Sequence, residues 1–502
     1  MRKLALLIIA ALPCLASGQK QYDTKKYFDD PMTSAVFNVY GKLLKENPND
    51  WETYLRRAND FYKYNYYDEA LDDVNQALAH IPAGNAADRV AAYNLRANIY
   101  QNLADHAHAL EDLNSSLVLD PEQYIAIYQR ANTEYELGQY AEAKQDYRKL
   151  QRMNPRSVES LVGQARIAVK EQNLGLANEY LDQAVSFDPN NAESYMRRAS
   201  VRQTMGNPRG AAQDLLVAYS IDATNGTPLF NLLELSDTDY AAVIAALTDA
   251  IQQAPRVALY PYVRATVELR HNNFVSALHD YQLIQRNFPA DADVVLVPMA
   301  QCQYSLGHYD DALANITSAL AAKKNAAEAS DHILRSQILL NLGRSAEALY
   351  AARDAAMQKD GSLGSAYQIA LCQVAMGDYG KAIQTLQDAD DSNSDEDKVL
   401  LGWIETNYRG SDDKSWLETM REMADPENYP EDKAYADYLM ACYYAQSGDT
   451  AKALDYAEAA MKGGYANYAD WTDSIGPFTV APIRQTTQFT ALLRRYAPIF
   501  GR

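Results

Sequence analysis

The stretch YIAIYQRANTEYELGQYAEAKQDYRKLQRMNP, residues 124–155, contains a pattern that recurs along the chain after 34 or 39 residues. Two small residues flank a glycine, aromatic residues lie between them and beyond them, and a proline ends the stretch. These positions are Ala131, Gly138, Tyr140, Ala143, Tyr147 and Pro155. A period of about 34 residues has room for two amphipathic helices of about 13 residues with short turns. The stretch therefore predicts a helix hairpin that the chain repeats.

Nine copies keep this pattern in nearly constant phase, and weaker copies lie near residues 224–257, 329–362 and 395–432. The first small residue of each good copy is Ala58, Ala97, Ala131, Ala165, Ala199, Ala265, Ala300, Ala370 or Ala441. In five copies a glycine marks the bend between the helices, where a left-handed backbone costs least. These glycines are Gly138, Gly206, Gly307, Gly377 and Gly448. Proline then closes the second helix of many copies, because it opposes helix continuation.

These residues resemble the tetratricopeptide repeat over nearly the whole chain after its first eighteen residues. The resemblance implies an all-α fold, a right-handed α-α superhelix (solenoid) of about twelve helix hairpins with terminal capping helices. A hairpin cannot bury both faces alone, so stacking on neighbours supplies the core and the ends need caps. The predicted segments are 1–18, a signal peptide; 19–50, a capping half-repeat; 51–223, about five repeats; 224–257, a degenerate repeat; 258–394, about four repeats; 395–432, a degenerate repeat; 433–461, the last repeat; and 462–502, a C-terminal cap.

The first eighteen residues combine two basic residues, an apolar run and a small-residue end, which predicts a secretory signal cleaved before Gln19. We therefore expect a periplasmic or secreted protein. A lipid anchor on Cys14 is disfavoured, because Pro13 stands where a lipoprotein signal has a small residue. No later segment reaches the roughly 18 apolar residues that span a bilayer, so we expect no membrane-spanning helix.

Charge and cysteine content exclude further classes. The 502-residue chain has a formal net charge of −20, and loss of Arg2 and Lys3 with the signal lowers it to −22. Nucleic acid is therefore not an expected partner, because phosphate binding needs a basic surface. The remaining cysteines, Cys302, Cys372 and Cys442, are too few for a disulfide framework and are predicted to be buried small hydrophobic residues.

An aspartate follows the arginine of the RAN motif, or of its relaxed copies, after sixteen residues. The pairs are Arg57 and Asp73, Arg96 and Asp112, Arg130 and Asp146, Arg198 and Asp214, and Arg264 and Asp280. Each partner lies eight residues from the predicted bend, so both stand about 12 Å up antiparallel helices. We predict an ion pair within each of the five hairpins, with a structural role.

The asparagine of the RAN motif follows the packed alanine by one residue, about 100° around the helix. In the tetratricopeptide superhelix that direction points into the concave groove, so the resemblance implies a ladder of Asn59, Asn98 and Asn132. Each would offer a donor and an acceptor to the backbone of an extended peptide; simple solvation of these side chains is the equally weighted alternative. The resemblance places further side chains on the same wall, namely Arg56, Tyr62, Lys63, Asn94, Tyr128, Gln129 and Tyr135.

Motifs of familiar enzymes and metal sites do not occur in the sequence. We therefore predict no catalytic residues, no metal and no cofactor. The leading hypothesis is a non-enzymatic scaffold that binds a protein or peptide partner in its groove. The alternative is an envelope glycan-binding helical-repeat protein, although the four tryptophans are scattered along nearly contiguous repeats.

Overall fold

The computed structural model describes residues 31–323, 327–358, 364–389, 394–428, 433–472 and 476–500. In these ranges all regular structure is helical and no strand occurs, which confirms the predicted all-α repeat class. The predicted signal peptide and Cys14 lie outside the described residues. The chain divides into an N-terminal unit that ends at Met205 and a C-terminal unit that begins at Gly206.

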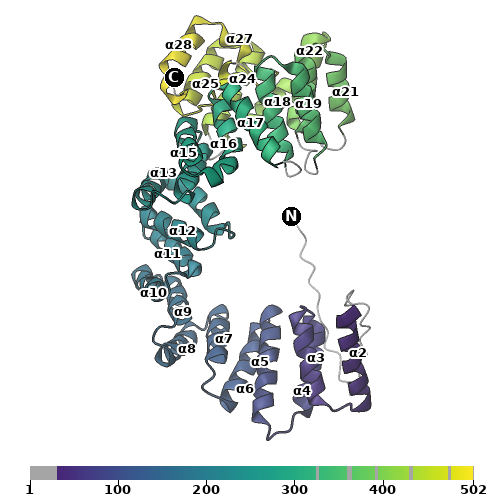
Figure 1. The fold of residues 1–502 in the computed structure, drawn as a ribbon, viewed down its shortest axis with the longest axis vertical. Helices are drawn as coiled ribbons and strands as arrows, with labels where there is room; N and C mark the ends of the chain where they lie inside the picture. Colours follow the sequence, from purple (N-terminus) through teal and green to yellow (C-terminus); the bar gives the residue numbers. More distant parts are fainter. Residues whose placement is uncertain are drawn as a thin grey trace. The chain divides into compact units, whose positions relative to one another are not determined.

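The N-terminal unit consists of a lone helix followed by consecutive hairpins, in which each second helix packs on its own first helix and on the next one. Figure 1 shows α2 to α7 standing side by side. The helices are α2 (Pro31–Glu46), α3 (Trp51–Lys63), α4 (Tyr67–His80), α5 (Ala86–Asn102), α6 (His106–Leu119), α7 (Tyr124–Glu136), α8 (Tyr140–Met153), α9 (Val158–Lys170), α10 (Leu174–Phe187) and α11 (Ala192–Thr204).

The C-terminal unit continues with the same kind of hairpin and ends in short helices. Its elements are α12 (Pro208–Ile221), α13 (Thr227–Gln253), α14 (Leu259–Arg270), α15 (Phe274–Asn287), η1 (Pro289–Val295), α16 (Leu296–Ser305), α17 (Tyr309–Lys323), α18 (Ala329–Asn341), α19 (Ser345–Ala356), α20 (Ser365–Ala375), α21 (Tyr379–Asp388), α22 (Asp395–Tyr408), α23 (Ser415–Met423), η3 (Pro426–Asn428), α24 (Lys433–Ser447), α25 (Thr450–Lys462), α26 (Tyr468–Thr472), α27 (Ala481–Arg484), α28 (Thr487–Arg495) and η4 (Ala497–Phe500).

The bend of each hairpin is a single residue with left-handed backbone, eight positions after the arginine position of the repeat. All five predicted glycines have positive φ, for example 76° at Gly138, which confirms this prediction. Other hairpins place a different residue type there at a φ between 58° and 63°. Those residues are Asn65, Ala104, Gln172 and Asn272. The repeat geometry therefore imposes the left-handed conformation even where no glycine lowers its cost.

Helix α13 departs from this rule within the predicted degenerate repeat. It runs for 27 residues and contains a kink at Asp239, where φ is −133° and ψ is 46°. Because φ stays negative there, the chain bends without the left-handed residue of the other hairpins.

The core of each hairpin consists of small residues where the two helices approach and of large residues beside them. Ala58, Ala70 and Ala77 are fully buried, and Phe61 is 1% exposed. At the C-terminal end Trp471, Phe489 and Phe500 close the core. The three cysteines are free and buried, as predicted. In the described part of the chain, none of the helices has both the length and the apolar character needed to cross a membrane.

Candidate functional site

In four of the five arginine–aspartate pairs, both residues belong to the same unit: three pairs lie in the N-terminal unit and one lies in the C-terminal unit. In each of these four pairs the carboxylate accepts two hydrogen bonds from the guanidinium group. Arg57 Nε and Nη2 donate to Asp73 Oδ2 and Oδ1 at 2.6 and 2.7 Å, with side chains only 7% and 3% exposed. The corresponding distances are 2.7 and 2.7 Å for Arg96 and Asp112, 2.7 and 2.9 Å for Arg130 and Asp146, and 2.6 and 2.7 Å for Arg264 and Asp280. Such bidentate contacts are among the stronger charge-assisted hydrogen bonds.

In Arg96, Arg130 and Arg264 the remaining guanidinium nitrogen contacts the preceding hairpin. Arg96 Nη1 donates to Asn75 Oδ1 at 2.6 Å, and Arg130 Nη1 donates to Asn114 Oδ1 at 2.9 Å. Hydrogen bonds to the aspartates raise the pKa of Arg96 and of Arg130, which keeps both guanidinium groups charged. Arg96, Arg130 and Arg264 therefore each hold three helices together.

The fifth predicted pair, Arg198 and Asp214, has its two residues in different units and stays a prediction. Within the N-terminal unit, Arg198 Nη1 donates to Asp182 Oδ1 on α10 at 2.8 Å. This contact reaches the preceding second helix, as the contacts from Arg96 and Arg130 do.

The asparagine ladder differs from its expected form at two of its three positions. Asn98 Oδ1 accepts a hydrogen bond from Gln129 Nε2 of the next first helix. Asn132 Oδ1 accepts hydrogen bonds from the Tyr147 hydroxyl at 2.7 Å and from Arg166 Nη1 at 3.3 Å. These oxygens are thus engaged within the chain, because the next hairpin supplies donors at the same level.

The amide NH₂ groups of Asn98 and Asn132 have no hydrogen-bond acceptor among the described residues, and neither does Asn59, which is exposed. The engaged oxygens also fix the orientation of the two amides, since a flipped amide would place NH₂ against the donors. The ladder therefore presents hydrogen-bond donors at Asn98 and Asn132, and only Asn59 retains both functions.

The other residues of the predicted wall vary in how free they are. Arg56 and Lys63 are exposed and form ion pairs with Glu52 at 3.5 Å and Asp60 at 3.1 Å. The Tyr62 hydroxyl accepts a hydrogen bond from Asn102 Nδ2 at 3.3 Å, and Asn94 Nδ2 donates one to Gln123 Oε1 at 2.8 Å. Tyr128 is half-buried in the core. The Arg166 guanidinium group lies 3.9 Å from the centre of the Tyr135 ring. The contacts of Tyr62, Asn94 and Tyr135 cross from one first helix to the next first helix or turn and stiffen the wall.

Sequence reasoning missed a hollow of about 1140 Å³ over α7, α9, α10 and α11. Its rim includes the basic side chains of Arg166, Lys170 and Arg197, and Met196 lies among its apolar residues. A signal for it exists in the sequence. Arg166 follows the packed Ala165 by one residue, so it occupies the ladder position after Asn132.

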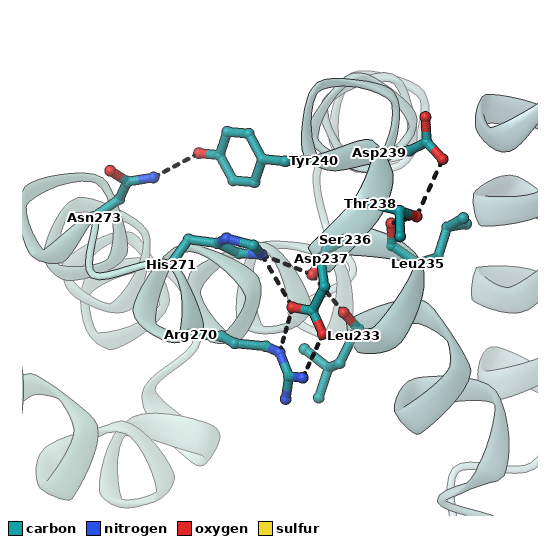
Figure 2. Close-up of polar contacts among 10 residues, drawn as sticks. All are labelled: Leu233, Leu235, Ser236, Asp237, Thr238, Asp239, Tyr240, Arg270, His271 and Asn273. Atoms are coloured by element: carbon teal, nitrogen blue, oxygen red, sulfur yellow. Dashed lines mark hydrogen bonds and ion pairs between the residues drawn. The ribbon is translucent and has the colours of Figure 1, made fainter. Parts of the chain in front are cut away.

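A second polar cluster surrounds the kink of α13 and contains a serine, a histidine and an aspartate (Figure 2). The Ser236 hydroxyl donates to the Leu233 carbonyl at 2.6 Å, so it accepts its 2.9 Å hydrogen bond from His271 Nε2. The same nitrogen lies 3.7 Å from Asp237 Oδ1. In a catalytic triad the serine donates to the histidine and the carboxylate binds the other ring nitrogen. This cluster lacks that arrangement, and Ser236 is fully buried.

The cluster instead connects α13 with α14. Arg270 Nε and Nη2 donate to the two oxygens of Asp237 at 2.8 and 2.5 Å, and these bonds lower the pKa of Asp237. The Tyr240 hydroxyl donates to Glu268 Oε2 at 2.6 Å and accepts from Asn273 Nδ2 at 2.8 Å. Contacts on both sides of the kink thus hold it in place.

Comparison with known families agrees with the hairpin geometry. Models of the tetratricopeptide repeat match residues 90–123, 128–192 and 365–392. The chain contains tetratricopeptide repeats. Its matched segments include the Arg96 and Arg130 pairs and two of the three ladder asparagines.

Known proteins similar to this repeat protein match it in part. The cellulose synthase operon protein C of Pseudomonas fluorescens (strain SBW25) is 28% identical over 187 residues, which are 36% of this chain and only 15% of that relative. Yeast Tom70 aligns with 77% of this chain and 94% of its own at 16% identity and a TM-score of 0.32. MamA from Desulfovibrio magneticus RS-1 aligns with 35% of this chain and 96% of its own at 15% identity and a TM-score of 0.32.

Proposed function

We propose that this protein is a non-enzymatic interaction scaffold that binds a peptide or protein partner along the first helices of its N-terminal unit. The observation that carries the proposal is the row of unengaged amide donors at Asn59, Asn98 and Asn132. Carbonyl oxygens recur along an extended peptide and accept hydrogen bonds from such donors. The leader-like sequence supports placing this role in the cell envelope or outside the cell.

The wall is also suited to binding because its side chains are already held in place. Asn132 is fixed by Tyr147 and Arg166, and Asn98 is fixed by Gln129. A partner that meets such a wall loses its own freedom but does not need to order the receptor, which favours affinity. The buried arginine–aspartate pairs hold the helices that carry these side chains.

A photocrosslinking experiment tests the proposal. A photoreactive amino acid at Asn59 preserves the hydrogen bonds within the wall, because the Asn59 side chain makes none among the described residues, and it leaves the Asn98 and Asn132 donors in place. The control is the same residue at Gln76, which is exposed on the second helix α4. We expect a discrete protein adduct from Asn59 in envelope extract and none from Gln76. Identical adducts from both positions, or none from either, would contradict the proposal.

A glycan-binding role is the second candidate, and one observation favours it. Tyr379 and Tyr408 stack with ring centres 4.0 Å apart, and Trp403 meets Tyr408 edge to face at 5.4 Å. Tyr408 is 44% exposed, so the cluster offers a flat aromatic surface to a sugar ring. The matched relative is named after a cellulose synthase operon. Binding on a glycan array that Tyr408→Ala abolishes would support this role over the scaffold.

A further inference from the structure

The hollow over α7, α9, α10 and α11 combines basic and apolar side chains in a strongly acidic protein. Its lining includes three cations and one carboxylate, whereas the whole chain has a formal charge of −20. The residues are Tyr135, Ala165, Arg166, Val169, Lys170, Gln172, Leu174, Leu181, Glu193, Met196, Arg197, Ser200, Val201 and Thr204. We call this surface the basic hollow.

The cations of the basic hollow differ in how far they are neutralised. Arg166 Nη2 donates to Glu136 Oε1 at 2.8 Å, and Arg197 Nη2 lies 2.6 Å from Glu193 Oε1. Lys170 is exposed at the end of α9, and among the described residues no carboxylate lies within ion-pair distance of it. A ligand carboxylate placed here would meet an uncompensated ammonium group.

The floor of the basic hollow is apolar. Val169 is 40% exposed, Leu174 and Met196 are half-buried, and Leu181 and Val201 lie beneath them. Methionine adapts its shape readily, which suits a surface that accepts a variable side chain. Water is held only weakly on these apolar side chains. Its displacement by a large apolar side chain of a partner would therefore lower the free energy.

A smaller hollow joins the basic hollow to the ladder. It is lined by Asn132 and Tyr128 on α7 and shares Arg166, Glu193 and Arg197 with the basic hollow. An extended chain that lies along the Asn59, Asn98 and Asn132 amides would therefore reach the basic hollow next.

We infer that the basic hollow receives a partner segment in which an acidic residue stands beside a large apolar residue. The inference rests on the proposed function and adds the chemistry of the partner. The carboxylate lies near Lys170 and Arg197, and the apolar side chain lies on Val169, Leu174 and Met196. The basic rim attracts a carboxylate, and this charge complementarity favours an acidic residue in the partner segment.

Selection from a phage library of random ten-residue peptides on the immobilised full chain tests the inference. We expect enriched peptides to carry Asp or Glu next to Leu, Ile, Met, Phe or Trp. Enrichment of peptides without acidic residues would overturn the inference and leave the proposed function standing. No enrichment of any peptide would overturn both.

Variants then locate the binding of one enriched synthetic peptide. Lys170→Gln combined with Arg197→Gln should weaken its affinity about tenfold at low salt, because two attractions are lost and Glu193 is left to repel the carboxylate. Arg152→Gln on α8 removes an exposed cation outside the hollow and should leave the affinity within about twofold. Circular dichroism checks that each variant is folded. Equal affinities for the two variants would overturn the placement in the basic hollow.

Discussion

The hairpins α5–α8 of the N-terminal unit and α16–α21 of the C-terminal unit pack alike but join their helices with different polar contacts. In both sets the packed alanines are fully buried, at Ala97 and Ala131 and at Ala300 and Ala370. The N-terminal hairpins use bidentate arginine–aspartate pairs. The C-terminal hairpins use neutral hydrogen bonds instead, from Asn315 Nδ2 to Gln303 Oε1 at 2.8 Å and from Thr385 Oγ1 to Gln373 Oε1 at 3.0 Å.

The neutral pairs use a different turn of the first helix. Gln303 and Gln373 each stand four residues after the position that holds arginine in the N-terminal hairpins, where the chain has Met299 and Ile369. Residues four apart lie on the same face of a helix, so the glutamine reaches the same place on the second helix. Close packing of small residues therefore defines the hairpin, and the polar contact across it can be satisfied in more than one way.

Removing one partner of the most buried ion pair should have the largest effect. Asp73→Ala leaves the Arg57 guanidinium buried without its carboxylate, and we expect the free energy of unfolding to fall by about 3–5 kcal/mol. The double variant Arg57→Met with Asp73→Ala should lose less, since no charge is stranded. Urea denaturation followed by circular dichroism measures both. A double variant less stable than the single one would show that Arg57 stabilises the fold even without Asp73, which would contradict the stranded-charge explanation.

Both units contain a helical glycine against which a large ring packs. A Cβ on Gly163 would overlap the Tyr147 ring, and a Cβ on Gly402 would lie 2.7 Å from Trp416 Cβ. Gly163→Ala and Gly402→Ala should each cost about 1–3 kcal/mol by overpacking. Gly175→Ala is the control, because its new methyl group would meet only Asn173 Oδ1, at 4.0 Å. Thermal melting of the three variants compares the units; unchanged melting of Gly163→Ala would mean that the Tyr147 ring moves without cost.

The two units also differ in a buried glutamate four residues after the repeat arginine. Glu134 is 7% exposed, its Oε2 has no hydrogen-bond partner in the described part of the chain, and burial raises the pKa of its carboxyl group to about 7. In the C-terminal unit the corresponding Glu268 accepts a hydrogen bond from the Tyr240 hydroxyl.

A raised pKa in the folded state means that the unfolded chain loses the Glu134 proton first as pH rises. The free energy of unfolding should therefore fall between about pH 4.5 and 7 and stay level above that range. Glu134→Gln should remove this loss and gain about 1–3 kcal/mol at pH 8, whereas Glu268→Gln should gain nothing. Urea denaturation at pH 5 and pH 8 measures the difference. If both variants gained the same stability at pH 8, the cause would be the lower net negative charge and not the burial of Glu134.

The smallest effect is expected for the neutral contact of the C-terminal hairpins. Thr385→Val keeps the shape of the side chain and removes the hydrogen bond to Gln373, which should cost about 0.5–1.5 kcal/mol. Its thermal melting is compared with that of Asp73→Ala. We expect a smaller loss of stability because Thr385→Val leaves only a neutral amide unpaired, whereas Asp73→Ala leaves a buried charge. A loss of stability as large as that of Asp73→Ala would contradict this explanation.

Much of the fold follows from local patterns. The recurrence of Ala131, Gly138 and Pro155 along the chain predicts where helices pack, bend and end, because each of these residue types favours one backbone geometry. The interval of sixteen residues between Arg130 and Asp146 likewise reflects two helices of equal length on either side of a bend. The left-handed backbone at non-glycine bends such as Ala104 was not predicted, because there the packing of the hairpin overrides the residue's own preference.

Amino-acid sequence by itself determined the repeat, its all-α class, the position of its bends and the partners expected across each hairpin. Only the tertiary structure decided that the oxygens of Asn98 and Asn132 are engaged, that α13 kinks at Asp239 and that a basic hollow continues the ladder. The reason is physical. A period along the chain specifies which residues face a neighbouring helix, whereas hydrogen bonds between hairpins depend on the distance and angle at which two repeats stack.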